Sequence, residues 1–285
     1  MPLSELLDEL FRLYRRHFTL IAGVALVVAL PGLVWQLITG SYKLTASSYA
    51  NLFTTASGGT PTFSNQQFSN LSGTYTLAAL GALVLLPLTV GAVTRAVTDV
   101  ALGRPAGVGS VLRETLARYF PLLGFIALVF LFFIVGAIVF AIGLVLLVLP
   151  GLAVFCFGVF LAIRWSLSVA GMMAEDLGPI QGLKRSWNLV KGQWFRTFGI
   201  LFIVGVMQAV IGFALGFLFG LIASAVTSGD VQLAVVSAGS TLLQALISPI
   251  TTIAIVLLYF DLRVRKEGLD LEQLAQQTSP GPAPA

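Results

Sequence analysis

Charged residues are scarce in this chain, and so are the side chains that carry most enzyme chemistry. Only 10% of its 285 residues are Asp, Glu, Lys or Arg, whereas soluble domains average about 25%. A single cysteine, Cys156, excludes an intramolecular disulfide, and a single histidine, His17, leaves too few ligands for a typical zinc site. A glycine-rich phosphate loop ending in Lys-Ser or Lys-Thr is also missing. We therefore expect no catalytic residues, no metal site and no cofactor.

The charged residues that are present separate long uncharged tracts. Apolar residues make up 57% of the sequence, and the uncharged tracts cover 18–42, 44–94, 119–163, 197–229 and 231–260. A helix needs about 20 apolar residues to cross a hydrocarbon core of about 30 Å. The sequence thus predicts an all-α integral membrane bundle of six transmembrane helices within residues 1–270. The predicted spans are 18–39, 75–98, 121–146, 150–173, 197–226 and 231–262. We expect the third tract to turn at Pro150-Gly151, with Gly143 as an alternative start of that turn.

Lys and Arg residues lie almost entirely at one end of the predicted spans. Fifteen of the sixteen fall there, and only Lys43 falls at the other end. By the positive-inside rule this distribution places both termini in the cytoplasm. The net charge of +4 then indicates contact with anionic headgroups of membrane lipids on the cytoplasmic leaflet, and no nucleic-acid partner. Residues 41–74 form an outer loop, either partly ordered or packed as a short cap, and 271–285 a disordered cytoplasmic tail.

A cytoplasmic amphipathic segment precedes each of the first, third and fifth spans. The first two cover about 3–18 and 108–120, with apolar residues on one helical face and charged residues on the other. The third has an apolar face made of Ile180, Leu183, Trp187, Val190 and Trp194, and a basic side with Lys184, Arg185 and Lys191. We predict three interfacial helices, arranged as three repeated units of one such helix plus a transmembrane hairpin. The alternative is that any span after a cytoplasmic loop acquires basic and aromatic flanks.

The third segment carries a family resemblance. Residues 183–196, Leu-Lys-Arg-Ser-Trp-Asn-Leu-Val-Lys-Gly-Gln-Trp-Phe-Arg, resemble the loop-to-helix motif of a bacterial multi-span membrane domain. That domain is attached to some glycerophosphodiester phosphodiesterases and also occurs alone. Residues 7–18 and Leu149-Pro150-Gly151 are similar to the same family. The resemblance implies a six-span domain of the bacterial inner membrane whose activity is not established. It does not imply phosphodiesterase chemistry, which belongs to a separate soluble barrel domain with paired histidines.

One basic residue is expected inside the lipid bilayer. Arg164 lies about 20 Å along the fourth span, and an arginine at mid-bilayer costs about 2.5–3.5 kcal/mol on insertion scales. Either its side chain extends to the cytoplasmic headgroups, or it joins Arg95, Asp99 and Asp261 in an intramembrane polar cluster. Each carboxylate also has a partner four residues away, Arg95 for Asp99 and Arg265 for Asp261. We favour extension to the headgroups together with these local pairs.

Small residues recur along the fifth span. Gly212, Gly216 and Gly220 follow one another at intervals of four, a spacing that lets two helix backbones approach closely in a membrane. The expected partner is the sixth span of the same chain, and the alternative is a second copy in a homo-oligomer. Gln208 lies one turn before this stripe and could form a hydrogen bond across a helix contact.

Two classes of function fit these patterns. The first is a non-enzymatic scaffold that organises lipids or partner proteins, which fits basic amphipathic helices and the lack of a polar pathway. The alternative is a transporter or channel for a small, lipid-like amphiphile that enters from the inner leaflet beside Arg164. Active transport usually requires several ionisable groups near the midplane, and the outer halves of these spans have essentially none. A polar cavity that reaches the midplane would favour transport, and a solid bundle would favour the scaffold.

Overall fold

The computed structural model describes residues 3–43, 65–146, 148–226 and 229–268, and every regular element in these ranges is a helix. Six stretches are long and apolar enough to cross a membrane, namely Phe18–Thr39, Gly73–Ala101, Tyr119–Gly143, Leu152–Ala174, Trp194–Ala223 and Val231–Glu267. Helices are expected here because lipid offers no partners for backbone N–H and C=O groups. The prediction of an all-helical chain with six such helices is confirmed. The predicted tail 271–285 and most of the predicted outer loop 41–74 lie outside the described residues.

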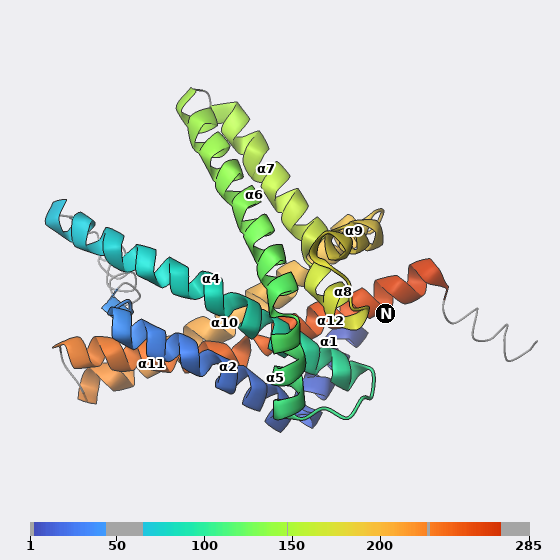
Figure 1. Cartoon of the computed structure of the whole chain (residues 1–285), viewed down its shortest axis with the longest axis horizontal. Coiled ribbons are helices and arrows are strands. Elements are labelled where there is room, and N and C mark those ends of the chain that lie inside the picture. Colours follow the sequence, from blue (N-terminus) through green and yellow to red (C-terminus); the bar gives the residue numbers. More distant parts are fainter. Residues whose placement is uncertain (1–2, 44–64, 147, 227–228, 269–285) are drawn as a thin grey trace, which may run out of the picture.

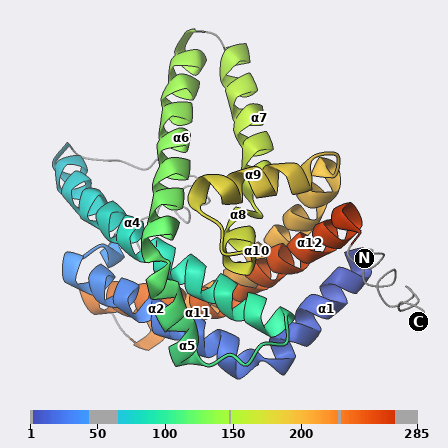
Figure 2. The same ribbon diagram turned by 45° about the vertical axis from the view of Figure 1, so that its right-hand side comes forward.

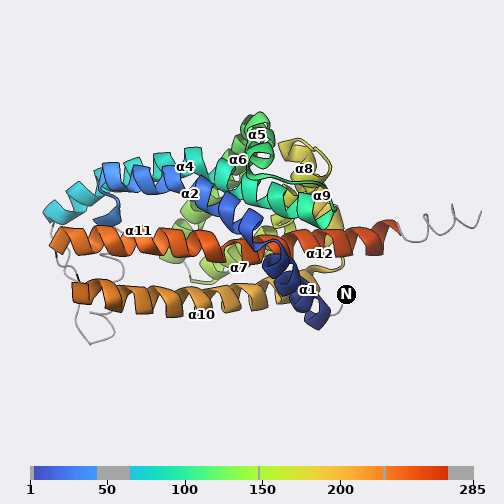
Figure 3. The same cartoon turned by 90° about the horizontal axis from the view of Figure 1, so that it is seen from below.

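Four long helices run side by side, and a helical hairpin diverges from them. The four are α2 (Phe18–Thr39), α4 (Asn65–Ala101), α10 (Trp194–Val226) and α11 (Gly229–Ile247), which Figure 3 shows as neighbouring rods. The hairpin consists of α6 (Tyr119–Leu146) and α7 (Val148–Trp165). It leaves the others at an angle, as the green helices in Figures 1 and 2 show. Its base contacts α4 and α10.

Two helix boundaries near prolines differ from the sequence prediction. Helix α6 continues through Gly143 to Leu146 and α7 begins at Val148, so Pro150 lies in the first turn of α7 rather than in the turn between them. Proline is tolerated there because a first-turn N–H has no acceptor within the helix. The sixth span is divided into α11 and α12 (Pro249–Glu267). Pro249 cannot donate to the carbonyl of Ala245, and the Ser248 hydroxyl donates to that carbonyl instead (3.4 Å).

One end of the molecule carries most of the charged residues and is called the charged end below. Helix α12 lies at the centre of this end. Its Ile253, Leu258, Tyr259 and Leu262 are completely buried. Helix α1 (Leu3–Arg16) packs on α12 and buries Leu6, Leu10 and Leu13. Burying a leucine of this kind contributes about 1.5–3 kcal/mol. The Tyr14 hydroxyl also donates to the carbonyl of Leu246 (2.6 Å) beside the break between α11 and α12.

Three short helices complete the charged end, namely α5 (Val108–Ala117), α8 (Ser168–Ala174) and α9 (Pro179–Val190). The predicted fourth span, 150–173, is therefore α7 followed by α8, with a break at Ser166 and Leu167. On α9 the buried residues are Gly182, Ser186, Leu189 and Val190. Trp187 and Ile180, which the sequence pattern assigns to the apolar face, are exposed. Helix α9 thus has a second apolar surface outside the core, part of which packs on Phe160 through Trp187.

Candidate functional site

The break between α7 and α8 places Arg164 at the charged end. Ser186 of α9 is buried against this break, where its hydroxyl donates to the Arg164 carbonyl (2.7 Å) and accepts from the Leu167 N–H (3.2 Å). These bonds satisfy two backbone groups that the interrupted helix would leave without partners. Ser186 therefore joins α9 to the end of α7 and sets where the Arg164 side chain begins.

Aromatic rings surround the Arg164 guanidinium. Its central carbon lies 4.4 Å from the ring centroid of Trp187 and 5.1 Å from that of Phe160, which are cation–π distances. One terminal nitrogen donates to the carbonyl of Trp187 (3.1 Å). The Nε atom is buried without a hydrogen-bond partner among the described residues. Arg164 is thus held in place by rings and one carbonyl, with its charge left uncompensated by these contacts.

Two lysines bring further positive charge to the same place. Lys266 of α12 donates to the carbonyls of Asn188 (2.5 Å) and Lys191 (2.6 Å). These carbonyls belong to the C-terminal end of α9, where the helix dipole favours a cation, and Gly192 with a φ of 82° turns the chain away. Lys266 also experiences the like charges of Arg164 and Lys191. We call the set Arg164, Trp187, Lys191 and Lys266 the Arg164 site.

Carboxylates are missing from the Arg164 site. Within the part of the chain that the structure describes, neither Arg164, Lys191 nor Lys266 lies within ion-pair distance of an Asp or Glu. The site offers several N–H donors and positive charge beside tryptophan rings. This arrangement can hold an anion.

Tryptophan and phenylalanine rings extend the wall of the site along α10. The Trp194 indole N–H donates to the Phe160 carbonyl (3.2 Å). Its ring stacks on Phe160 and on Phe198, with centroids 5.9 and 5.3 Å away. Tryptophan is typical of the membrane–water interface because the ring is apolar and its N–H is polar. The Arg164 site therefore has an apolar side that continues into the length of α10.

Arg185, predicted with Lys184 and Lys191 as part of a basic helix, is instead bound within the protein. It forms ion pairs with Glu175 (2.7 Å) and Glu267, and the buried Tyr259 hydroxyl donates to Glu175 as well. Burial alone would lower the pKa of Arg185, but the hydrogen bonds from its guanidinium to Glu267 and Glu175 outweigh burial and raise that pKa above its usual value. This Glu175 network joins α8, α9 and α12.

A second ion-pair network joins α4, α5 and the segment after α8. Arg95 contacts Asp99 (3.1 Å) and Glu114 (2.6 Å), and Arg118 contacts Asp176 (2.7 Å). Both arginines also donate to backbone carbonyls at the end of α8, Arg95 to Met173 (3.2 Å) and Arg118 to Met172 (3.3 Å). The Arg95 and Asp99 side chains are only 14% and 8% exposed, so removing one of them would leave the other charge with little solvent.

The predicted intramembrane cluster of Arg164, Arg95, Asp99 and Asp261 is therefore distributed over three places. Asp99 pairs with Arg95, and Asp261 pairs with Arg196 (2.7 Å) and Arg265 (3.0 Å). Arg164 contacts none of these carboxylates. The sequence shows the pairs that are four residues apart, but the link from Asp261 to Arg196 spans 65 positions and has no local signal.

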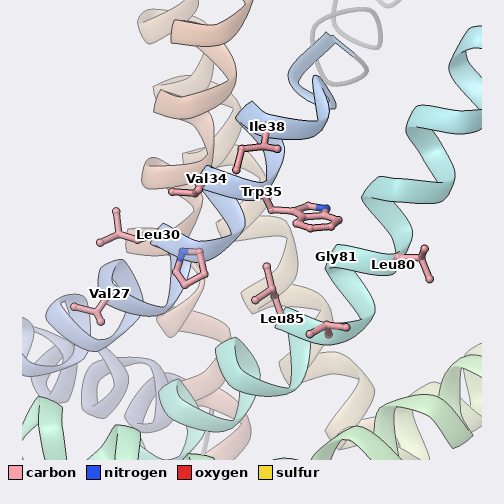
Figure 4. Close-up of a pocket in the computed structure, with 10 residues that line it drawn as sticks. Val27, Leu30, Val34, Trp35, Ile38, Leu80, Gly81 and Leu85 are labelled. Atoms are coloured by element: carbon pink, nitrogen blue, oxygen red, sulfur yellow. The ribbon is translucent and has the colours of Figure 1, made fainter.

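An apolar groove lies between α2 and α4, in the part of these helices away from the charged end. It has a volume of about 730 Å³, and its lining is shown in Figure 4. The lining residues are all apolar: Val27, Leu30, Pro31, Val34, Trp35, Ile38, Leu80, Gly81, Val84 and Leu85. The Trp35 ring lies against Gly81, and its N–H donates to the Leu77 carbonyl (3.0 Å). This groove provides no polar pathway.

The glutamines of the spans form interhelical hydrogen bonds instead. Gln36 of α2 accepts from Thr241 of α11 (3.0 Å), and Gln208 of α10 accepts from Thr251 of α12. These contacts use polar groups to join neighbouring helices, α2 to α11 and α10 to α12. Neither glutamine lines the groove between α2 and α4.

The glycine stripe of α10 is not where this chain packs most closely. A Cβ added at Gly216 or Gly220 would meet nothing within 4 Å, and one at Gly212 would meet only Gln244, at 4.0 Å. The close contact between α10 and α11 is at Gly239, where the Phe219 ring occupies the space of a side chain. A large ring over a single glycine leaves no spacing pattern in the sequence, so the sequence could not predict this contact.

Comparison with family models, curated proteins and solved structures finds no match to this chain. Among the residues that the structure describes, no three His, Cys, Asp or Glu side chains lie together as metal ligands.

Proposed function

We propose that this chain is a non-enzymatic, multi-pass protein of a bacterial inner membrane that binds and organises anionic lipids on the cytoplasmic leaflet. In this proposal both termini and the charged end lie on the cytoplasmic side. The observation that carries it is the Arg164 site, where three cations gather beside tryptophan rings without a carboxylate in contact. Anionic headgroups are attracted to basic residues at the membrane surface, by about 1 kcal/mol per residue.

Exposed phenylalanines support a membrane surface at the level of the charged end. One follows each proposed interfacial helix at the start of a span: Phe18 is 47% exposed, Phe120 79% and Phe195 84%. Side chains this apolar are costly to expose to water, whereas the boundary between headgroups and hydrocarbon accommodates them. We accordingly propose that α1, α5 and α9 lie along this boundary. Three repeated units remain a proposal, as does the resemblance to the multi-span domain.

Transport of a small amphiphile is the second candidate, and one observation favours it. The α6–α7 hairpin diverges from the four-helix group (Figure 1), and Arg164 lies at its base. An amphiphile from the inner leaflet would meet the Arg164 site first. Against this, Gln36 and Gln208 are used in helix contacts, and the groove between α2 and α4 is apolar.

Lipid analysis of the purified protein tests the scaffold proposal. The protein is extracted from its membrane with a polymer that retains neighbouring lipid, and the headgroups are quantified against those of the whole membrane. We expect anionic lipid to be enriched by about fivefold or more, because each basic residue contributes about 1 kcal/mol and the site contains three of them. Unchanged lipid composition would refute the proposal. Protein-dependent movement of a labelled amphiphile in proteoliposomes would favour the transporter.

A further inference from the structure

The three cations of the Arg164 site retain hydrogen-bond donors that no described residue uses. Arg164 has five N–H groups, and one terminal nitrogen bonds a carbonyl. Lys266 gives two of its three protons to carbonyls. The Lys191 side chain makes no hydrogen bond to the described residues, while its own carbonyl holds Lys266. The donors left over belong to side chains that all meet the last turn of α9.

The surroundings of these donors favour an anion with more than one charge. Three positive charges close together repel one another, and an anion with more than one charge offsets this repulsion better than a singly charged one. A phosphate monoester carries about −1.5 to −2 charges at pH 7 and three terminal oxygens. A phosphodiester carries one charge and two such oxygens, and so satisfies fewer donors.

The apolar side of the site indicates where the remainder of the ligand lies. Trp187 is 37% exposed and Phe202, two turns into α10, is 58% exposed. Phe160, Trp194 and Phe198 connect them as a chain of neighbouring rings. An anion that carries acyl chains can place its phosphate on the cations and its chains along these rings, whereas a soluble anion would leave the rings unused.

We propose that the Arg164 site binds the headgroup phosphate of a phospholipid whose phosphate is a monoester, with phosphatidic acid as the simplest example. This inference rests on the proposed function and narrows it from anionic lipids in general to one headgroup class. Arg164, Lys191 and Lys266 donate to the phosphate oxygens, and Trp187 orients the Arg164 guanidinium.

Native mass spectrometry of the full chain in detergent tests this assignment. The probes are phosphatidic acid, phosphatidylglycerol and phosphatidylcholine with identical acyl chains. We expect the wild type to bind phosphatidic acid about tenfold more tightly than phosphatidylglycerol. The R164Q/K266Q variant should lose most of this preference. Lys184→Gln is the matched control, because Lys184 is an exposed residue of α9 outside the site, and the preference should remain.

Each result of this experiment supports or overturns a distinct claim. Equal binding of the two anionic lipids, both above phosphatidylcholine, would overturn the headgroup assignment and leave the proposed function in place. No preference for either anionic lipid would overturn both. If inorganic phosphate in large excess displaces phosphatidic acid completely, and a short soluble phosphate monoester binds equally well, the ligand is a soluble anion and the lipid assignment is wrong.

A pH series gives an answer that does not depend on the folding of a variant. The second proton of a phosphate monoester leaves with a pKa of about 6, whereas a phosphodiester stays singly charged. For the wild type, the preference for phosphatidic acid should therefore shrink between about pH 8 and about pH 5, with phosphatidylglycerol binding nearly constant. A preference that does not change over this range would contradict the role of the second charge.

Discussion

Glu175 is the carboxylate whose loss we expect to weaken the charged end most. It accepts from Arg185 (2.7 Å) and Tyr259, and Arg263 lies 3.4 Å away. Glu175→Gln keeps the shape but leaves two arginines with reduced compensation. Removing one partner of a fully buried pair costs about 3–5 kcal/mol. Since the Arg185 and Arg263 side chains are 25% and 29% exposed, we expect about 2 kcal/mol here.

Thermal unfolding in detergent, followed by the loss of monodisperse protein, measures this change. A loss of about 2 kcal/mol should lower Tm by about 4–8 °C in a chain of this size. Glu9→Gln is the matched control, because the Glu9–Arg12 pair lies on the surface of α1 with an exposed arginine. It should shift Tm by less, by no more than about 2–4 °C, since surface pairs contribute about 0–1 kcal/mol.

A double-mutant cycle with Tyr259→Phe tests whether the network acts as a unit. The buried Tyr259 hydroxyl donates to Glu175, so its removal should cost less in the Glu175→Gln background than in the wild type. We expect an interaction energy of about 0.5–3 kcal/mol, as for residues in direct contact. If Glu175→Gln leaves Tm unchanged, or if the two substitutions are simply additive, the network does not hold α8, α9 and α12 together.

Three further predictions concern packing, the helix break and topology. Gly239→Val should lower Tm because its side chain would overlap the Phe219 ring. Gly216→Val, with nothing within 4 Å, should leave Tm unchanged in a monomer and disrupt the assembly if that stripe joins two copies. Tm and the oligomeric state of the two variants distinguish these outcomes. Ser186→Ala should lower the free energy of unfolding by about 1–3 kcal/mol, because it leaves the Arg164 carbonyl and the Leu167 N–H without a partner. Unfolding measurements read this change directly. Epitope tags at the two chain ends should be accessible from the same side of the membrane, and tags on opposite sides would refute the proposed orientation.

Local pairing could be predicted from spacing, and distant pairing could not. Arg95 with Asp99 and Arg265 with Asp261 are four residues apart on one helix, so their contacts follow from helix geometry. Glu175 has no such partner. It lies at the end of α8, and Arg185 is brought to it because α9 packs back on α8. The Glu175 network therefore leaves no signal in the order of the residues.

Periodicity likewise predicted apolar faces without saying what covers them. The pattern places Trp187 on the apolar side of its helix, yet the protein buries Ser186 and Leu189 and leaves Trp187 exposed. Both readings are compatible with the same sequence, because lipid and protein are each apolar partners for a helix. The break between α7 and α8 leaves backbone groups that Ser186 satisfies, and this contact turns the Ser186 face of α9 toward the protein.

The sequence alone determined that this chain is helical and that six of its helices can span a membrane. Uncharged tracts of sufficient length leave the backbone no other way to satisfy its own polar groups in lipid. Tertiary structure decided where the charges go. It bound Arg185 to carboxylates and left Arg164 among rings and lysines, because those contacts join residues that are distant in the chain and adjacent only after the helices have packed.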